Sequence, residues 1–302
     1  MHFAHYSSLG EIKIGSPLVM AIGVFDGLHL GHRQLFKVLL EESKKKKAKS
    51  AVWTFNSKIP KPKFCRLMNE STYLSGLEKL GVEEVHKMDF IEEVSQMSAR
   101  EFLKKVLISK LNVQSLVIGE DARLGRDRAT SANEFQELAA EVGLEVHLVP
   151  LLEDEKGVIS SSRIREALLE GRFTEVDILM GESFQVSGEV TKDQQLGRTI
   201  GFPTANIKDS GTVFPPKGVY KTEVDVSGKG EKWLKAMSYV GSRPTVDESG
   251  EVLVLETHIP NWSGDLYGKV LTVRSFNKIR DEMKFSSVEE LKVQLKKDLK
   301  LI

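Results

Sequence analysis

The sequence has little of several features that would narrow its function. It contains a single cysteine, Cys65, so no disulfide can form within the chain. The chain has 43 lysine and arginine residues and 43 aspartate and glutamate residues. It therefore lacks the basic excess expected of a protein that neutralises nucleic-acid phosphates. No apolar run approaches the roughly 20 residues that span a bilayer, and the first residues lack the basic end and apolar block of a secretion signal. We therefore expect a cytoplasmic protein with no membrane or nucleic-acid role.

Two sequence patterns divide the 302 residues. From residue 18 to about 180, short apolar runs alternate with helix-like segments, which is typical of an α/β domain with a parallel sheet. After residue 183, alternating segments separated by short turns predict a mostly antiparallel sheet or barrel. Ser287 and Glu290 have capping-box spacing at the start of a final amphipathic helix, which we expect to cover the barrel. The sequence therefore predicts two domains, residues 1–182 and 183–302.

Residues 21–36, "AIGVFDGLHLGHRQLF", combine glycines and histidines where a strand gives way to a helix. Such a corner offers backbone amides to a phosphate group. The glycine spacing does not match the dinucleotide-binding fingerprint, and the lysine of a P-loop is missing. His29 and His32 could each donate a hydrogen bond to a phosphate as pyrophosphate departs, which indicates nucleotidyl transfer. A histidine-capped helix and a two-histidine metal site are the alternatives.

A second polar element, "ISSSRIREALLEGR", begins at Ile159. Its serines can cap a helix, and Ser162 adds a hydroxyl donor beside the helix amides. Arg165 could reach a phosphate from the first turn. The element is either a phosphate-binding helix start or an ordinary capped helix.

A third element, "GRTIGFPTANI", spans residues 197–207. Thr204 and Asn206 are hard oxygen donors suited to magnesium, two residues apart on one side of an extended strand. Gly197 and Gly201 leave room for phosphate against backbone amides. The alternative is an edge strand with surface hydroxyl groups.

Together these motifs resemble two known families. "IGVFDGLHLGH", "VIGEDARLG" and "ISSSRIR" resemble the adenylyltransferase half of prokaryotic bifunctional FAD synthetases, in the HIGH-type nucleotidyltransferase superfamily. "GRTIGFPTANI", "VGSRPTV", "LETHI", "GDLYGK" and "IRDEMKF" resemble riboflavin kinase in order and spacing, over residues 184–298. The resemblance implies an N-terminal Rossmann-like domain and a C-terminal antiparallel riboflavin kinase β-barrel with a closing helix.

The resemblance also implies two reactions. The C-terminal domain would convert riboflavin and ATP to FMN and ADP, and the N-terminal domain would convert FMN and ATP to FAD and pyrophosphate, both with magnesium. It implies that Glu256 is the general base for the riboflavin 5′-hydroxyl, with His29 and His32 catalytic in the other half and Thr204 and Asn206 holding magnesium. It places the flavin beside Asp121, Arg280 and Asp281. It places ATP beside Gly23, Phe25, Gly27, His29, His32, Ser162, Arg165, Gly197, Gly201 and Thr204. Taken alone, Glu256 would be a surface residue and Arg280 with Asp281 a surface ion pair.

The match to the families departs at three places. Ala122 and Leu124 stand where family members usually have aromatic residues, and "TFNSKIPKP" replaces a usual TFxPHP segment. Tyr239 stands where an asparagine is usual. Two alternative functions follow. The first is a paralogue with only one efficient activity, namely a kinase whose adenylyl transfer is weakened. The second is a flavin-binding regulatory module with little turnover.

Overall fold

The computed structural model describes residues 1–56, 65–192, 196–207, 211–228, 230, 232–244 and 251–302. The chain divides into two compact units, Met1–Phe64 with Tyr73–Ser160 and Cys65–Thr72 with Ser161–Ile302. The domain boundary that the sequence predicts after residue 182 stays a prediction. The segments "TFNSKIPKP" beyond residue 56 and "VGSRPTV" beyond residue 244 lie outside the described residues. In the described part of the chain, no helix has both the length and the apolar character needed to cross a bilayer.

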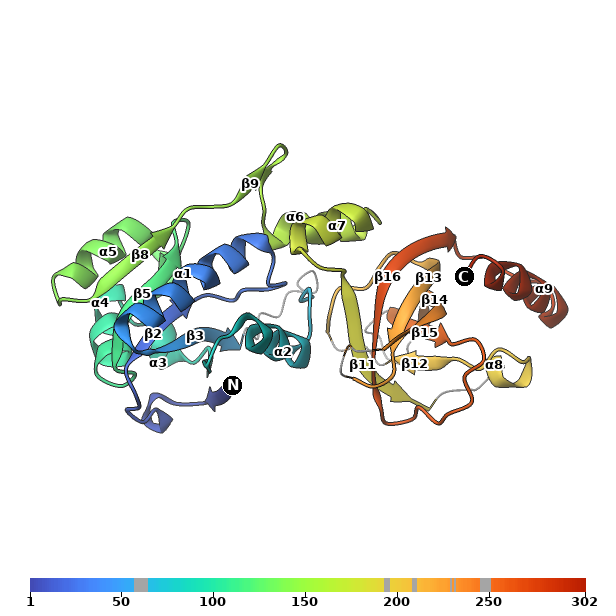
Figure 1. Cartoon of the computed structure of the whole chain (residues 1–302), viewed down its shortest axis with the longest axis horizontal. Helices are drawn as coiled ribbons and strands as arrows, with labels where there is room; N and C mark the ends of the chain where they lie inside the picture. Colours follow the sequence, from blue (N-terminus) through green and yellow to red (C-terminus); the bar gives the residue numbers. More distant parts are fainter. Residues whose placement is uncertain (57–64, 193–195, 208–210, 229, 231, 245–250) are drawn as a thin grey trace. The chain divides into compact units, whose positions relative to one another are not determined.

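The first unit is built on a six-stranded parallel sheet, with the strand order β1-β4-β3-β2-β5-β8 (Figure 1). The central strand β2 reads LVMAI and is buried along most of its length, as expected for a parallel strand covered on both faces. The strands of this sheet are β1 (His2–Tyr6), β2 (Leu18–Ile22), β3 (Lys49–Asn56), β4 (Glu84–Asp89), β5 (Val113–Gly119) and β8 (Glu145–Val149).

Helices form the layers on either side of this sheet. The helical segments are η1 (Leu9–Glu11), α1 (Leu30–Lys46), α2 (Glu70–Leu80, in this unit from Tyr73), α3 (Glu92–Ser95), α4 (Ala99–Glu101), the π-helical η2 (Phe102–Ile108), η3 (Arg126–Arg128) and α5 (Ala132–Ala140). Two short strand pairs complete the unit: β6 (Arg123–Leu124) with β7 (Thr130–Ser131), and β9 (Glu153–Asp154) with β10 (Gly157–Val158). Helix α1 packs against β2, β3 and β5.

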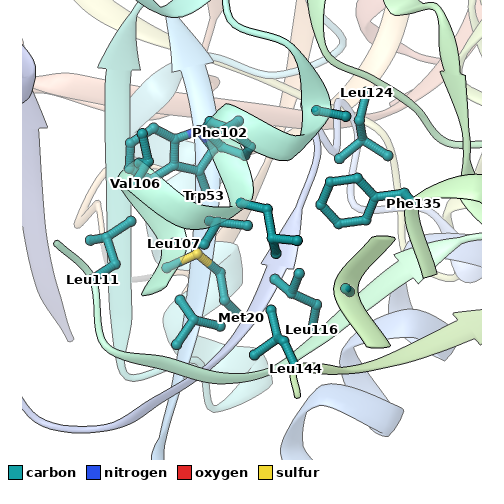
Figure 2. Close-up of a cluster of buried hydrophobic side chains, with 14 of the residues drawn as sticks. Met20, Trp53, Phe102, Val106, Leu107, Leu111, Leu116, Leu124, Phe135 and Leu144 are labelled. Atoms are coloured by element: carbon teal, nitrogen blue, oxygen red, sulfur yellow. The ribbon is translucent and has the colours of Figure 1, made fainter. Parts of the chain in front are cut away.

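The main core of the first unit lies on the face of the sheet opposite α1. Figure 2 shows Met20 and Trp53, from neighbouring strands, beside Phe102 and Leu107 of η2. The Trp53 and Phe102 rings meet at a steep angle with centroids 5.9 Å apart. Because successive strand residues point to opposite faces, Met20 and Trp53 fill this core while their chain neighbours face α1.

The second unit is a closed antiparallel barrel with the strand order β11-β12-β15-β14-β13-β16. Its strands are β11 (Gln185–Thr191), β12 (Ala205–Ile207), β13 (Gly218–Asp225), β14 (Trp233–Pro244), β15 (Glu251–His258) and β16 (Val270–Arg280). Closure removes the exposed edges that would otherwise pair with other chains. The parallel sheet and the barrel that the sequence predicts are both confirmed.

The barrel interior contains a chain of hydroxyl groups as well as apolar side chains. Thr222 Oγ1 lies 2.8 Å from Ser238 Oγ, which lies 2.9 Å from Thr257 Oγ1. All three residues are buried, and each bond crosses between neighbouring strands. The chain satisfies polar groups that would otherwise be costly to bury.

Four helices accompany the barrel in the described part of the second unit. They are α6 (Ser161–Leu169), α7 (Phe173–Met180), α8 (Leu196–Thr199) and α9 (Val288–Leu299). Phe173 of α7 packs against the Tyr220 and Phe276 rings of the barrel, with centroids 5.7 and 6.0 Å away. The predicted final helix is thus confirmed, with Ser287 as its N-cap. The predicted capping box is wrong in one half, because the Glu290 carboxylate accepts from Ser286 rather than from the Ser287 backbone.

The segment Cys65–Thr72 belongs to the second unit although it lies within the N-terminal part of the sequence. Arg66 forms a parallel bridge with Thr212. The Arg66 carbonyl accepts from the Val213 amide at 2.8 Å, and the Asn69 side-chain amide donates to the Ser187 carbonyl at 2.8 Å. These bonds attach the segment to the barrel.

We expect Leu116→Ala to destabilise the first unit by about 2–5 kcal/mol, because Leu116 is fully buried on β5 and its removal leaves a cavity. The free energy of unfolding can be followed by Trp53 fluorescence in a protein whose Trp233 and Trp262 are replaced by phenylalanine. Ile14→Ala is the control, since Ile14 is 70% exposed and its truncation should change stability by less than about 0.5 kcal/mol. Equal effects of the two substitutions would contradict the described core.

Candidate active sites

The first candidate site lies at the carboxyl ends of β2 and β5 in the first unit. β2 lies between β3 and β5, and the chain proceeds from it to β3 on one side before reaching β5 on the other. Ligands of open α/β sheets bind outside the carboxyl ends of the strands at such a reversal of strand order. Residues 23–29 follow β2 at this point, and residues 120–122 follow β5. The predicted nucleotide corner therefore coincides with the position that the topology favours.

The loop between β2 and α1 has an unusual backbone conformation. Phe25, Gly27 and Leu28 have φ values of 50°, 90° and 44°, in the left-handed region. Residues other than glycine rarely adopt this backbone conformation, and such strain is concentrated at functional sites. Phe25 meets the His32 ring edge-on at 5.3 Å and tilts against Phe36 at 5.0 Å. These contacts help to hold the strained loop in place.

His29 and His32 are brought together at the start of α1. His29 is the N-cap residue, and the two rings stack with centroids 3.6 Å apart and planes inclined by 23°. Within the described residues, the buried Nδ1 atom of each ring has no hydrogen-bond partner. Because buried polar atoms are nearly always hydrogen-bonded, two such nitrogens in a pair of stacked rings indicate a place for a ligand.

Burial sets the charge of this histidine pair. It lowers the pKa of His29 to about 4. Burial, reinforced by the neighbouring His29, lowers the pKa of His32 well below its usual value. Both rings are therefore neutral at pH 7, and each carries one N–H donor. Since the pair also lies at the positive end of a helix, it suits an anionic group such as a phosphate.

Gly31 allows close packing around the pair. A Cβ atom there would lie 3.2 Å from Cε1 of the His29 ring and 3.4 Å from the Ile159 carbonyl oxygen. Gly23 is equally restricted, since its Cβ would lie 2.7 Å from the Phe25 ring. Ile159 is the first residue of the "ISSSRIR" motif, so Gly31 brings the start of α1 against the beginning of that motif.

Ser162 and Arg165 lie on α6, which belongs to the second unit. Ser162 is exposed, and the Arg165 Nε donates to the Cys65 carbonyl at 3.3 Å. That Ser162 and Arg165 bind the same phosphates as His29 and His32, and that the two histidines bind phosphate at all, stays a prediction from the sequence.

The turn after β5 carries Asp121, which is exposed. Ala122 packs against the main core of the first unit, and Leu124 is part of it. The two positions where aromatic residues are usual in the resembled family therefore help to fill the core. The place of Asp121 beside a flavin stays a prediction.

The second candidate site lies on the outer face of the barrel, around Glu256. On β15, Leu255 and Thr257 are buried inside, and Glu256 points outward and is half-buried. The strand register places Asn206 of β12 directly opposite Glu256 on one side and Tyr239 of β14 on the other. Directly paired residues of antiparallel strands share a face, so these three side chains form a row.

Thr204 joins this row from the segment before β12. Its hydroxyl group donates to Glu256 Oε2 over 3.5 Å, the limit for a hydrogen bond. Thr204 and Asn206 also line a cavity of about 440 Å³ whose wall includes Trp262, Asp265 and Tyr267. The structure thus brings the predicted magnesium ligands and the predicted base to one place, next to a cavity large enough for a small ligand.

The two predicted glycines precede Thr204 in a tight turn. The Phe202 amide donates to the Gly197 carbonyl at 2.8 Å, and a Cβ atom at Gly197 would lie only 2.4 Å from the Phe202 carbonyl oxygen. Gly201 has a φ of 87°. Both positions require glycine for the backbone itself, and whether they also receive a phosphate stays a prediction.

Arg280 and Asp281 end β16 and begin the connection to α9. The Arg280 Nε donates to Asp298 of α9 at 2.9 Å, and Asp298 is almost fully buried. Asp281 is exposed and pairs with Lys278. Arg280 thus attaches the final helix to the barrel, which sequence reasoning did not predict because the two residues are 18 positions apart. Their place beside a flavin stays a prediction.

Sequence reasoning also did not identify a partner for Tyr239. Its hydroxyl group donates to the Glu282 carboxylate in the connection after β16. The alternating sequence patterns of β14 and β15 could have placed Tyr239 next to Glu256. Its hydrogen-bond partner Glu282 could not be predicted, because it lies on an irregular segment with no periodic pattern.

Comparisons with known proteins agree with this arrangement. Residues 11–163 match the family model of FAD synthetase, and residues 180–302 match that of riboflavin kinase. The chain is 35% identical over 291 residues to the bifunctional riboflavin kinase/FMN adenylyltransferase of Escherichia coli strain K12, covering 93% of this chain and 90% of that protein. It is 33% identical over 292 residues to the protein of the same name from Haemophilus influenzae, covering 93% and 91%.

A solved structure shows the same fold over the full length. The crystal structure of a protein named a macrolide-efflux protein, from Streptococcus pneumoniae, is 34% identical, with a TM-score of 0.85. The match covers 100% of this chain and 98% of that one. With both family models and the relatives spanning nearly the whole sequence, this chain belongs to the bifunctional riboflavin kinase/FMN adenylyltransferase family of enzymes.

Proposed function

We propose that the barrel phosphorylates riboflavin with ATP to give FMN, and that the first unit transfers the adenylyl group of a second ATP to FMN to give FAD. The observation that carries this proposal is the convergence of Thr204, Asn206 and Glu256 beside one cavity. The stacked, neutral pair of His29 and His32 supports the second reaction. The alternatives predict different products from riboflavin and ATP. A kinase with weakened adenylyl transfer would accumulate FMN without FAD, and a regulatory module would form little of either.

In the kinase reaction, Glu256 accepts the proton of the riboflavin 5′-hydroxyl group. The hydroxyl oxygen then bonds to the γ-phosphorus of ATP as the bond from that phosphorus to ADP breaks. A carboxylate is suited to this role because it can both orient an alcohol and take its proton. Positioning and charge neutralisation provide most of the catalysis in phosphoryl transfer. Glu256 is half-buried on β15, which is paired with a strand on each side, and we propose that this placement positions the carboxylate.

The donor set beside Glu256 fits magnesium. The Thr204 hydroxyl and the Asn206 amide oxygen are the hard oxygen ligands that this ion prefers, and both line the cavity. Magnesium bound there with ATP would neutralise phosphate charge. Thr204 and Asn206 are the residues that we propose hold it, while Glu256 handles the proton.

In the adenylyl transfer, a phosphate oxygen of FMN attacks the α-phosphorus of ATP, and the bond to pyrophosphate breaks. His29 and His32 each donate an N–H to phosphate oxygens on which charge develops. Because the rings are neutral before ATP binds, the polyanion raises their pKa values and favours protonation as charge accumulates. We propose that Ser162 and Arg165 add donors to the same phosphates, and that Asp121 lies by the flavin.

Glu256→Gln should lower kcat for riboflavin phosphorylation by about 10²–10⁴-fold, because the amide cannot take the proton. The conversion of FMN to FAD should stay unchanged. Riboflavin, FMN and FAD are separated by chromatography over time, with riboflavin or FMN as the starting flavin. Glu189→Gln, a change at an exposed acid on β11, is the matched control. A variant that keeps full kinase activity would refute the role of Glu256.

His29→Ala and His32→Ala should each lower adenylyl transfer to FMN by about 10²–10³-fold, as expected for the loss of one donor to a developing charge. Riboflavin phosphorylation should continue, so FMN should accumulate. Circular dichroism checks that the variants fold, and His5→Ala on the exposed edge strand β1 is the control. Loss of both activities in a folded variant would contradict the division of labour.

Acid should destabilise the first unit through His29. Between about pH 6.5 and about pH 4, the unfolded chain binds a proton at His29 that the folded chain does not, so stability falls as pH falls. The pKa of about 4 corresponds to a loss of up to about 3 kcal/mol across this interval. Urea unfolding at several pH values, followed by Trp53 fluorescence, measures it. His29→Asn should lose less stability on acidification than the wild type; parallel curves would contradict the buried neutral imidazole.

A further inference from the structure

Tyr239 occupies a defined position beside the proposed general base. It lies directly opposite Glu256 in the β14–β15 pairing, on the outer face of the barrel. Its other cross-strand neighbour is Val219 of β13, which in turn pairs with Arg280 at the end of β16. Tyr239 therefore lies between Glu256 and the segment that follows β16.

The orientation of the Tyr239 ring is fixed. The ring and hydroxyl group lie over Gly241 on the same strand face, where a Cβ atom would overlap them. The hydroxyl group donates to Glu282, two residues beyond β16. Gly241 thus provides the space that lets the phenol reach across the barrel surface.

The phenol is a permanent donor in this position. Burial, the bond to Glu282 and the negative charge of Glu256 raise the pKa of Tyr239 above its usual value. The hydroxyl group therefore stays protonated at neutral pH. Its proton is directed to Glu282, while the Glu256 carboxylate accepts a hydrogen bond from the Thr204 hydroxyl group.

The segment containing Glu282 is held at both ends by other interactions. Arg280 is bonded to Asp298 of α9, and Ser286 is bonded to Glu290 in the first turn of that helix. Between these anchors, the side chains of residues 281–284 are exposed. Among the interactions described for this stretch, the bond from Tyr239 to Glu282 attaches its middle to β14, next to Glu256.

We propose that Tyr239 is a positioning residue of the kinase site, and that its hydrogen bond to Glu282 holds residues 281–285 against the barrel face as a wall for the bound riboflavin. This inference rests on the proposed kinase function. The tyrosine acts through the segment and does not exchange a proton with the substrate. The structural reason is that a segment anchored only at its ends would have to be ordered each time the alcohol substrate binds.

The test compares Tyr239→Phe, Glu282→Gln and the double variant. Tyr239→Phe should raise the KM for riboflavin about tenfold, the factor expected for one hydrogen bond to a charged group. The kcat and the KM for ATP should change less than about twofold, because Glu256, Thr204 and Asn206 keep their places. Glu282→Gln should weaken riboflavin binding in the same direction, and the double variant should lose little more than Tyr239→Phe, since the two groups form one bond.

Hydrogen exchange of the amides of residues 281–285 provides a readout that does not depend on turnover. Exchange there should be faster in Tyr239→Phe, while the exposed control Glu289→Gln on α9 should leave both exchange and KM unchanged. An unchanged KM for riboflavin in an active enzyme, or unchanged exchange of the segment, would overturn the inference. If the wild-type protein does not phosphorylate riboflavin, the proposed function fails by itself. In that case, riboflavin affinity measured by flavin fluorescence tests the role of the hydrogen bond from Tyr239 to Glu282. Equal affinities of the wild type and Tyr239→Phe would overturn that role.

Discussion

The register in which β15 pairs with its two neighbours determines the chemistry of the barrel. A strand presents alternate residues to opposite faces, so a slip by one residue would exchange the inside and the outside. Glu256 would then point into the interior, where an unpaired carboxylate is strongly unfavourable. The hydroxyl chain from Thr222 through Ser238 to Thr257 favours the observed register, because its bonds form only when these side chains face inward. The same pairing that satisfies the interior therefore aligns Asn206, Glu256 and Tyr239 outside.

The two units handle polar side chains in opposite ways. In the barrel, the proposed base stays half-buried at the surface, with oxygen and amide groups beside it. In the first unit, two imidazoles are buried against each other and kept uncharged. Keeping the buried pair neutral avoids the larger cost of burying a charge before the ligand arrives, and the pair can respond to the ligand's charge afterwards. The strained loop from Phe25 to Leu28 is consistent with a corner held in place by its surroundings rather than by local preference.

Much of this arrangement could be predicted from the sequence. The apolar runs gave the parallel sheet, the alternating segments gave the barrel, and the motifs placed His29 beside His32 and Glu256 beside Thr204 and Asn206. The pairs Arg280–Asp298 and Tyr239–Glu282 could not be predicted, since each joins a strand to a residue whose position depends on tertiary packing. Glu290 was expected to complete a capping box, but a serine one position earlier offers both its amide and its hydroxyl group. The packing of Ala122 and Leu124 in the core could likewise not be predicted, because a short turn has no periodic sequence pattern.

The segment Cys65–Thr72 has a consequence for how the two halves can be separated. It is inserted in the sequence between elements of the first unit, yet it is bonded to Gly211, Val213 and Ser187 of the barrel. No single cut in the polypeptide therefore yields two complete pieces: a fragment that begins at residue 161 lacks a contributor to its own surface. The chain path of the second unit is therefore discontinuous, and a complete second unit needs residues from both sides of residue 160.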